Sequence, residues 1–200
     1  MQKLALKLGV LGVSAVLGLL ACGGSQQSAE PPATAAAVPP AEPPPAEASP
    51  AKSIQVPFQA KSGSTLAGTA TLTEAPGGVK VVVAIDNVSP GEHGTHVHEK
   101  GDCSAPDGAS AGGHFNPEGN PHSLPAASST RHLGDLGNIN VGPDGKGTLE
   151  IVIPGANLKD NDADSFIGRA IIVHEKTDDG GQPTGNAGGR IGCAEIKNAA

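Results

Sequence analysis

The order of apolar and polar residues predicts a series of short β-strands from about residue 53 onward. Leu66, Ala70 and Leu72 alternate with threonines at positions 69, 71 and 73, as expected of a strand with one buried face. Residues 79–88 are rich in β-branched side chains, which favour strands. Further strands are expected in the segment that follows residue 91 and at 54–60, 136–141, 147–153, 170–174 and 190–196.

Turn residues separate these segments, and no segment after residue 22 has the apolar period of a helix. Eight strands with turn-forming connections predict an all-β fold, an eight-stranded antiparallel sandwich or barrel. Two connections are much longer than a turn, at 100–135 and 176–189. Long loops in compact domains are often functional, so the sequence predicts a β-framework that carries two functional loops.

The first 52 residues have a different character. Lys3 and Lys7 precede an apolar run that ends near Leu20, which predicts a signal peptide over 1–21 rather than a membrane span or a helix of the folded domain. The ending Leu-Leu-Ala-Cys resembles a bacterial lipoprotein signal, in which Cys22 carries a lipid. Residues 22–52 include eight of the 18 prolines and predict a disordered tether, so 53–200 is the expected folded domain.

Charge and aromatic content narrow the classes of partner. The formal net charge is −7, and no cluster of Lys and Arg is present, which argues against a nucleic-acid partner. The three aromatic residues are phenylalanines, so the chain lacks a base-stacking platform. The predicted signal and lipid place the chain in the cell envelope, attached to a membrane and facing the periplasm or the exterior. The sequence allows a homodimer but does not define the oligomeric state.

A His-x-His pair is the first candidate for chemistry. In an extended strand His96 and His98 point to the same face, and Val97 points to the other. Two adjacent imidazoles can chelate one metal ion, although two solvated histidines would give the same pattern. The pair alone is therefore weak evidence for a metal site.

The remaining histidines strengthen the metal hypothesis. Six of the seven, together with one aspartate, can be divided into two sites by residue type. Four imidazoles suit copper, and three imidazoles with one carboxylate suit zinc. The first set is His96, His98, His114 and His174; the second is His122, His132 and Asp135 with one shared histidine. The spacing alone does not show which histidine is shared.

Five motifs in order resemble the copper/zinc superoxide dismutases. They are Gly94-Thr-His-Val-His-Glu-Lys-Gly-Asp102, Gly113-His-Phe-Asn-Pro117, Arg131-His-Leu-Gly-Asp-Leu-Gly-Asn138, Val173-His-Glu-Lys-Thr-Asp-Asp179 and Gly185-Asn-Ala-Gly-Gly-Arg-Ile-Gly-Cys193. The resemblance covers the chain from about residue 53. It implies a Greek-key β-barrel of immunoglobulin-like sandwich architecture with copper and zinc as cofactors.

The resemblance also implies a role for each matching residue. His114 corresponds to the histidine that bridges the two metals and completes both ligand sets. Asp178 corresponds to a carboxylate that links a copper-ligand histidine to a zinc-ligand histidine, and Arg190 to an arginine beside copper that attracts superoxide. Without the match, Arg190 would be read as an ordinary surface arginine. His93 corresponds to a structural histidine and is given no ligand role.

The three cysteines fit an exported protein. If Cys22 is lipidated, Cys103 and Cys193 remain, and both match the disulfide of the family. Two free thiols that bind a metal are the alternative, which an oxidising compartment disfavours.

The implied activity is dismutation of superoxide to oxygen and hydrogen peroxide by alternate reduction and oxidation of copper, with zinc in a structural role. A copper-buffering or copper-delivery lipoprotein on the same scaffold is the alternative, and an envelope protein that has lost its activity is a third hypothesis. Two features depart from the familiar family pattern. Thr95 stands where a bulky residue is common, and the segment between Asp179 and Arg190 contains no charged residue.

Overall fold

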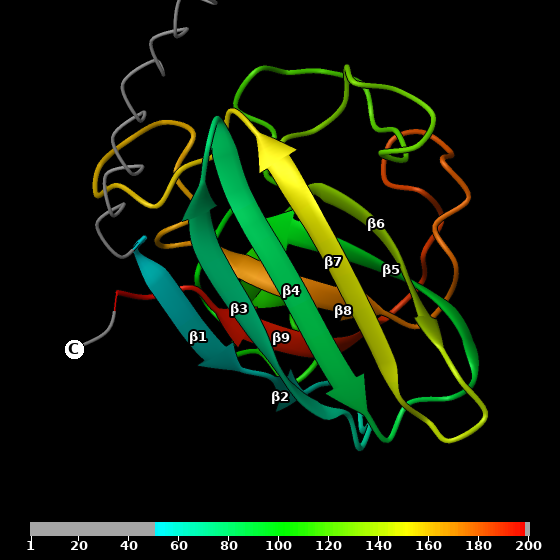
Figure 1. The fold of residues 1–200 in the computed structure, drawn as a ribbon. Coiled ribbons are helices and arrows are strands. Elements are labelled where there is room, and N and C mark those ends of the chain that lie inside the picture. The colour runs from blue at the N-terminus through cyan, green and yellow to red at the C-terminus, as the bar shows by residue number, and fades with distance from the viewer. Residues whose placement is uncertain (1–50, 199–200) are drawn as a thin grey trace, which may run out of the picture. The chain divides into compact units, whose positions relative to one another are not determined.

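The structure, a computed structural model, describes residues 51–198. In this part of the chain nine β-strands form one antiparallel sheet that curls into a nearly closed barrel (Figure 1). The strands are β1 (Ser53–Pro57), β2 (Gln59–Ala60), β3 (Ala67–Ala75), β4 (Gly78–Asp86), β5 (Gly91–His98), β6 (Asp135–Val141), β7 (Gly147–Pro154), β8 (Ala170–His174) and β9 (Arg190–Glu195). A short 3₁₀ turn, η1 (Ala109–Ala111), lies in the loop after β5.

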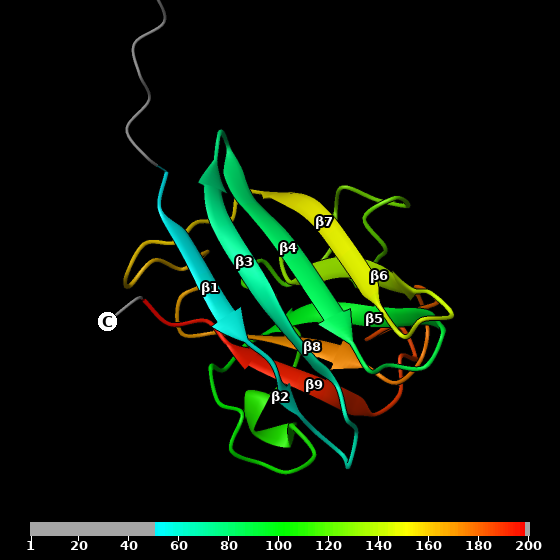
Figure 2. The same cartoon turned by 60° about the horizontal axis from the view of Figure 1, so that its bottom comes forward.

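The strands follow the order β1-β3-β4-β7-β6-β5-β8-β9-β2. Figure 1 shows β1, β3, β4 and β7 crossing in front of β5, β6, β8 and β9, so the barrel is flattened into two layers. In Figure 2, η1 lies beside β2 and β9, outside the barrel. The predicted all-β antiparallel fold is confirmed.

The number of strands differs from the prediction by one because the segment expected at 54–60 is divided at Phe58. Its first half pairs with β3 and its second half with β9, at the two ends of the sheet. Pro57 has no N–H to donate, and the Phe58 side chain is buried in the core while its N–H donates to Gly68 O (3.0 Å). The divided strand therefore brings the two edges of the sheet together and nearly closes the barrel.

The core follows from the alternation along the strands. In β4 the side chains of Val79, Val81, Val83 and Ile85 point inward and are buried. Similar residues from the other strands join them in one large cluster. A second, smaller cluster contains the two domain cysteines and three apolar neighbours: Cys103, Ala111, Ala170, Ile172 and Cys193.

Three long connections join the strands. Residues 99–134 and 175–189 correspond to the two connections predicted at 100–135 and 176–189, and the third, 155–169, was not predicted. The third connection is ordered by its own apolar residues, since Leu158 and Phe166 are fully buried and a bridge pairs Asn157 with Ser165.

The predicted signal peptide, the predicted lipidation site Cys22 and the predicted tether up to residue 50 lie outside the described residues. Lys52, at the end of the predicted tether, already contacts the barrel: its Nζ donates to Leu158 O (2.6 Å) and its carbonyl accepts from Glu74 N (2.9 Å). Among the described residues we find no helix with the length and apolar character needed to cross a membrane.

Candidate metal centre

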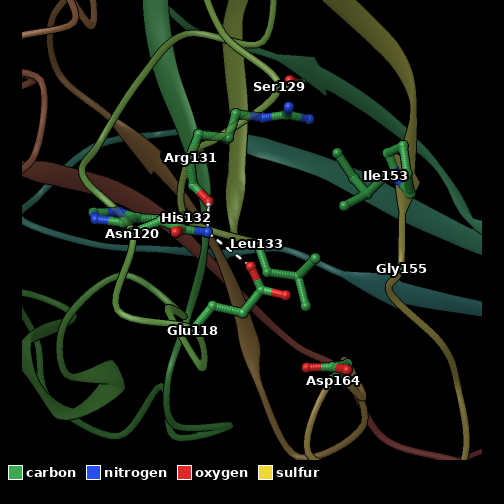
Figure 3. A pocket seen from close by; sticks show the side chains of 10 residues that line it. Glu118, Asn120, Ser129, Arg131, His132, Leu133, Ile153, Gly155 and Asp164 are labelled. Atoms are coloured by element: carbon green, nitrogen blue, oxygen red, sulfur yellow. Dashed lines mark hydrogen bonds between the residues drawn. The ribbon is translucent and has the colours of Figure 1, made fainter.

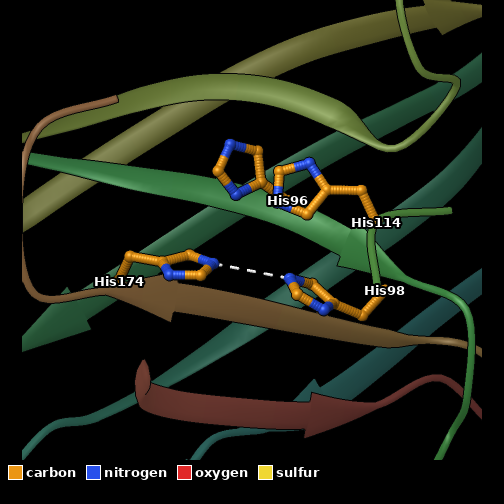
Figure 4. A group of neighbouring side chains, drawn as sticks. All are labelled: His96, His98, His114 and His174. Atoms are coloured by element: carbon orange, nitrogen blue, oxygen red, sulfur yellow. Dashed lines mark hydrogen bonds between the residues drawn. The ribbon is translucent and has the colours of Figure 1, made fainter. Parts of the chain in front are cut away.

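Two neighbouring strands and one loop bring four histidines together. His96 and His98 lie on the outer face of β5, and Val97 between them packs into the barrel core. His174 ends β8, which pairs with β5, and His114 comes from the loop 99–134. Figure 4 shows the four rings facing one another, and one ligand atom from each lies within 4.8 Å of all the others.

Irregular pairing directs these histidines. The register between β5 and β6 shifts between Thr95 and His96, and the register between β8 and β9 shifts between Val173 and His174. Such bulges change the direction of a side chain and occur often beside active sites. Both shifts lie immediately before a histidine of the group.

The hydrogen bonds of the imidazoles show where their lone pairs point. Nδ1 of His98 donates to Gly112 O (3.0 Å), and Nδ1 of His174 donates to Gly188 O (3.2 Å). Their Nε2 atoms therefore carry lone pairs, and these atoms face each other at 3.4 Å. Nε2 of His96 donates to Asp178 (2.8 Å), so the neutral ring carries its lone pair on Nδ1.

The unprotonated nitrogen of His96 has no hydrogen-bond partner. Among the described residues, it is the one fully buried side-chain nitrogen or oxygen in that condition. A buried polar atom without a partner is costly, and a metal ion that accepts its lone pair removes that cost. The convergence of this atom with the Nε2 atoms of His98 and His174 fits a copper ion, for which imidazole is a suitable ligand.

These four histidines form the first group, and burial keeps three of them neutral. It holds the pKa of His98 well below the ordinary value, and it lowers the pKa of His174 to about 3 and that of His114 to about 4. The nearby charge of Arg190 acts in the same direction on His98 and His174. Because a histidine must be unprotonated to bind a metal, these side chains are ready to coordinate at neutral pH.

A second group surrounds the buried carboxylate of Asp135, the first residue of β6. Its Oδ1 lies 3.2, 3.0 and 3.3 Å from the Nδ1 atoms of His114, His122 and His132. Its Oδ2 accepts from the backbone N–H groups of Ser123 and His132 (3.1 Å each). Burial by itself raises the pKa of Asp135, but the three imidazoles outweigh burial and lower it far below the usual range. Three nitrogens and one carboxylate oxygen are a donor set that fits zinc.

The two groups share side chains. The sets of ligand atoms that lie within 4.8 Å of one another are His96, His98, His114, His174 and His96, His114, His122, Asp135. His132 is absent from the second set, although its Nδ1 is 3.4 Å from Nδ1 of His114. His96 enters the set because its ring stacks on that of His114, with centroids 4.0 Å apart.

Asp178 joins the two groups. Its Oδ2 lies 2.8 Å from Nε2 of His96, and its Oδ1 lies 3.0 Å from Nε2 of His122. Burial by itself lowers the pKa of His122, but the carboxylates of Asp135 and Asp178 outweigh burial and raise it to about 9. Burial by itself raises the pKa of Asp178, but the hydrogen bonds to His122 and His96 outweigh burial and lower it. A carboxylate in this position fixes the orientation of both rings.

Two residues to which the sequence motifs gave no role, Asn138 and Gly185, lie against Asp178. Asn138 of β6 exchanges two hydrogen bonds with the backbone of Asp178, at 2.8 and 2.9 Å. A Cβ atom at Gly185 would lie only 2.0 Å from Oδ1 of Asp178 and 2.8 Å from Nε2 of His122. Gly185 also has a φ of +76°, which favours glycine. The sequence motif that contains Gly185 was the signal that could have singled out this residue. Its neighbour His122, however, is distant in the sequence.

Arg190 begins β9 at the edge of the first group. Its Nη1 donates to Gly108 O (2.7 Å) and its Nη2 to Gly112 O (2.6 Å). Gly112 O also accepts from His98, so the guanidinium and a histidine of the group share one backbone carbonyl. The guanidinium is partly buried, which lowers its pKa, but an arginine stays charged at neutral pH.

The other residues singled out from the sequence do not belong to either group of candidate ligands. Cys103 and Cys193 form the disulfide that the resemblance implies, with Cα atoms 5.8 Å apart. His93 lies outside both groups, and its ring nitrogens contact the carbonyls of His174 and Ser89, each at 2.9 Å. Thr95 is fully buried, and its hydroxyl donates to His93 O (3.2 Å).

A cavity of about 380 Å³ lies on the side of the second group. Figure 3 shows Glu118, Asn120 and Arg131 from the long loop around it, with Asp164 on the opposite side. His132 forms part of its wall. The second group is therefore closest to solvent at His132.

Comparisons of the sequence with known proteins give clear matches. Residues 66–196 match the family model described as copper/zinc superoxide dismutase. An extracellular superoxide dismutase [Cu-Zn] of Caenorhabditis elegans is 38% identical over 150 residues, which cover 70% of this chain and 66% of that protein. The chain thus spans just under two thirds of that relative.

Two solved structures are similar to this chain in both sequence and fold. A SOD-like protein from Bacillus subtilis is 34% identical, with a TM-score of 0.62 over 71% of this chain and 97% of the other. The clock protein EA4 is 36% identical, with a TM-score of 0.64 over 74% of this chain and 96% of the other.

Proposed function

Because the chain belongs to the copper/zinc superoxide dismutase family, we propose that it is an enzyme that converts superoxide to oxygen and hydrogen peroxide. The observation that carries the proposal is the convergence of imidazole nitrogens from His96, His98 and His174 beside the charge of Arg190. Imidazole nitrogens of this kind hold copper, and a fixed positive charge beside them suits an anionic substrate.

We assign His96, His98, His114 and His174 to copper, and His114, His122, His132 and Asp135 to zinc. His132 is preferred to His96 for zinc because Nδ1 of His132 faces Asp135. His96 has its Nε2 on Asp178, and its other nitrogen, Nδ1, is already assigned to copper. Nδ1 of His114 lies in the zinc group, which leaves its Nε2 for the copper group. His114 is therefore the residue that both sites share.

Copper, when bound, supplies the alternate reduction and oxidation that a one-electron reaction of superoxide requires. The protein contributes the rest. Nε2 of His114, the nitrogen assigned to the copper group, would hold a proton for the product when it does not bind copper. Asp178 fixes the rings of His96 and His122, and Arg190 attracts the anion against the negative charge of the domain.

We extend the proposal to the location of the protein. Because Cys103 and Cys193 are paired, Cys22 is the cysteine left without a partner in the folded domain, which supports its assignment as the lipidated residue. The named relative is an extracellular protein. The segments proposed are a signal peptide at 1–21, a lipid-anchored tether at 22–52 and the enzyme domain at 53–200, in the cell envelope. A homodimer stays a prediction, which light scattering would test.

The decisive experiment measures superoxide removal by the chain after reconstitution, with copper and zinc counted per chain. We expect many turnovers per copper ion. Binding of one copper ion per chain without turnover would instead support a copper-buffering role.

Two variants separate binding of the metal from use of the substrate. His114→Ala removes the shared ligand, so we expect loss of turnover and weaker binding of both ions. Arg190→Ala should lower kcat/KM by about tenfold or more, since charges that steer an anion act on this quantity, with copper content unchanged. Arg190→Lys keeps the charge and should retain part of the activity. Full activity in both His114→Ala and Arg190→Ala would contradict the proposal.

A further inference from the structure

The guanidinium of Arg190 is held by backbone carbonyls rather than by a side chain. Gly108 O and Gly112 O accept its two hydrogen bonds, and both belong to the loop 99–134. In residues 51–198 no carboxylate forms a salt bridge with Arg190. Its charge therefore stays available to an anion, but its position depends on where the loop backbone lies.

The turn between β2 and β3 fastens that part of the loop. Lys61 is 7% exposed, and its Nζ donates to Cys103 O and to Gln59 Oε1 (3.4 Å). The next residue, Ser62, donates its backbone N–H to Pro106 O (2.8 Å). Two carbonyls of the loop, shortly before Gly108, are thus bound by adjacent residues of one turn.

The same turn fastens the beginning of β9. The hydroxyl of Ser62 donates to the carbonyl of Arg190 itself (2.8 Å). The carbonyl of the next residue, Ile191, accepts hydrogen bonds from Lys61 N (3.0 Å) and from Ser64 Oγ (2.6 Å). The turn therefore fixes the backbone of Arg190 as well as the loop that receives its guanidinium.

Packing around Gly108 links the two sides. A Cβ atom built at Gly108 would lie 3.3 Å from Cδ of Arg190 and 3.7 Å from Cγ of Lys61. The stems of the two basic side chains thus pack on the same residue of the loop. A shift of Lys61 would move the surface on which Arg190 rests.

We propose that Lys61 and Ser62 are positioning residues that set the orientation of Arg190 toward the metal centre. They act through the loop and the strand start and do not contact the substrate. The inference rests on the proposed function only for its effect on turnover, since the orientation of Arg190 can be measured without any superoxide. A purely structural role for Lys61, as an anchor of the disulfide loop, is the competing explanation.

The test uses the reactivity of Arg190 toward phenylglyoxal, a reagent that modifies arginine, in the full-length, metal-loaded chain. Mass spectrometry of peptides gives the rate at Arg190 relative to that at Arg169, which stacks on Phe115. In Lys61→Met and in Ser62→Gly we expect this ratio to rise about threefold to tenfold, because a guanidinium released from hydrogen bonds is more accessible and such bonds shift equilibria by at least this factor.

Matched variants serve as controls. Lys80→Met removes an exposed lysine that pairs with Glu150, and Asn161→Gly changes another residue with positive φ, as Ser62→Gly does. Both should leave the ratio unchanged. Lys61→Arg keeps a cationic donor and should keep the ratio within about twofold of the original, because hydrogen bonds from a charged donor are preserved.

The outcomes distinguish the two proposals. If Lys61→Met and Ser62→Gly lower the melting temperature but leave the reactivity ratio unchanged, the positioning role is wrong. If the ratio rises and kcat/KM for superoxide falls with copper content intact, the inference is supported in full. If the ratio rises but the original chain shows no turnover, Arg190 is positioned as inferred and the proposed activity is the part that fails.

Discussion

Two regions of the molecule, the front layer of the barrel and the loops of the metal centre, are stabilised in different ways. In the layer formed by β3, β4 and β7, long antiparallel ladders and alternating aliphatic side chains provide the stability. Around the metal centre, the loops 99–134 and 175–189 contain almost no regular structure and are held by side chain to backbone hydrogen bonds and one disulfide. Apolar burial tolerates exchange of similar residues, whereas the loops depend on single polar atoms.

The disulfide should give the largest effect, because it holds the loop region where no large apolar core does. It closes 90 residues, which corresponds to about 4–5 kcal/mol in the loop-entropy model. We expect the variant with both Cys103→Ala and Cys193→Ala to lose free energy of unfolding of this order in chemical denaturation. A loss smaller than that of a single core truncation would show that the loops are stabilised mainly by other contacts.

A core truncation should act on stability without changing the centre. Leu72 is fully buried in the barrel, so Leu72→Ala should reduce the free energy of unfolding by about 2–5 kcal/mol. The affinities for copper and zinc should be unchanged. Val152, which is 46% exposed, provides the control, since Val152→Ala should have little effect. Weaker metal binding in Leu72→Ala would show that the two regions are energetically coupled.

A single methyl group added in the loop region should have the opposite effect: it should weaken metal binding rather than mainly lower the stability of the barrel. In Gly185→Ala the new Cβ would overlap Asp178 and His122, so we expect zinc affinity to fall by about 10- to 100-fold, as when an outer partner of a ligand is removed. Gly63→Ala is the matched control, because Gly63 has a similar φ of +74° and open space around it. Competition with a chelator measures both affinities, and equal effects in the two variants would attribute the loss to backbone strain alone.

The metal-free chain should be most stable near pH 6.5, and this dependence should come from the loop region. The lowered pKa values of His98, His114 and His174 mean that the unfolded chain binds protons more readily, so stability falls as pH decreases from about 6.5 toward 4. The raised pKa of His122, about 9, adds stability that is lost as pH rises from about 6.5 through 9. Melting temperatures across this range would test both slopes, and a flat profile would contradict them.

The sequence predicted the fold better than it predicted the contacts that orient the site. Alternating residues such as those of β3 and β4 identified the strands, because one face of each strand is buried. The division at Phe58 was missed because the alternation of Ile54, Val56 and Phe58 continues across it, and this pattern does not show that its two sides pair with different strands. The connection 155–169 was missed because its buried residues are few and lack a period.

The candidate ligands could be named from residue type and from the motifs, since copper and zinc accept few kinds of side chain. The contacts of Asn138, Gly185 and Lys61 could not, because each joins positions at least 40 residues apart or fills a space that no spacing reveals. The choice between His96 and His132 for the second group likewise depends on which nitrogen of each ring is already engaged.

The His-x-His pair shows which features follow from the sequence alone and which depend on the tertiary structure. The period of a strand determined that His96 and His98 share a face, because side chains alternate whatever the surroundings. Only the tertiary structure decided that Nδ1 of His96 is buried without a partner and that Asp178, 82 residues away, engages its other nitrogen. Local geometry is encoded by neighbouring residues, whereas the direction of a lone pair depends on hydrogen bonds that form after distant segments pack together.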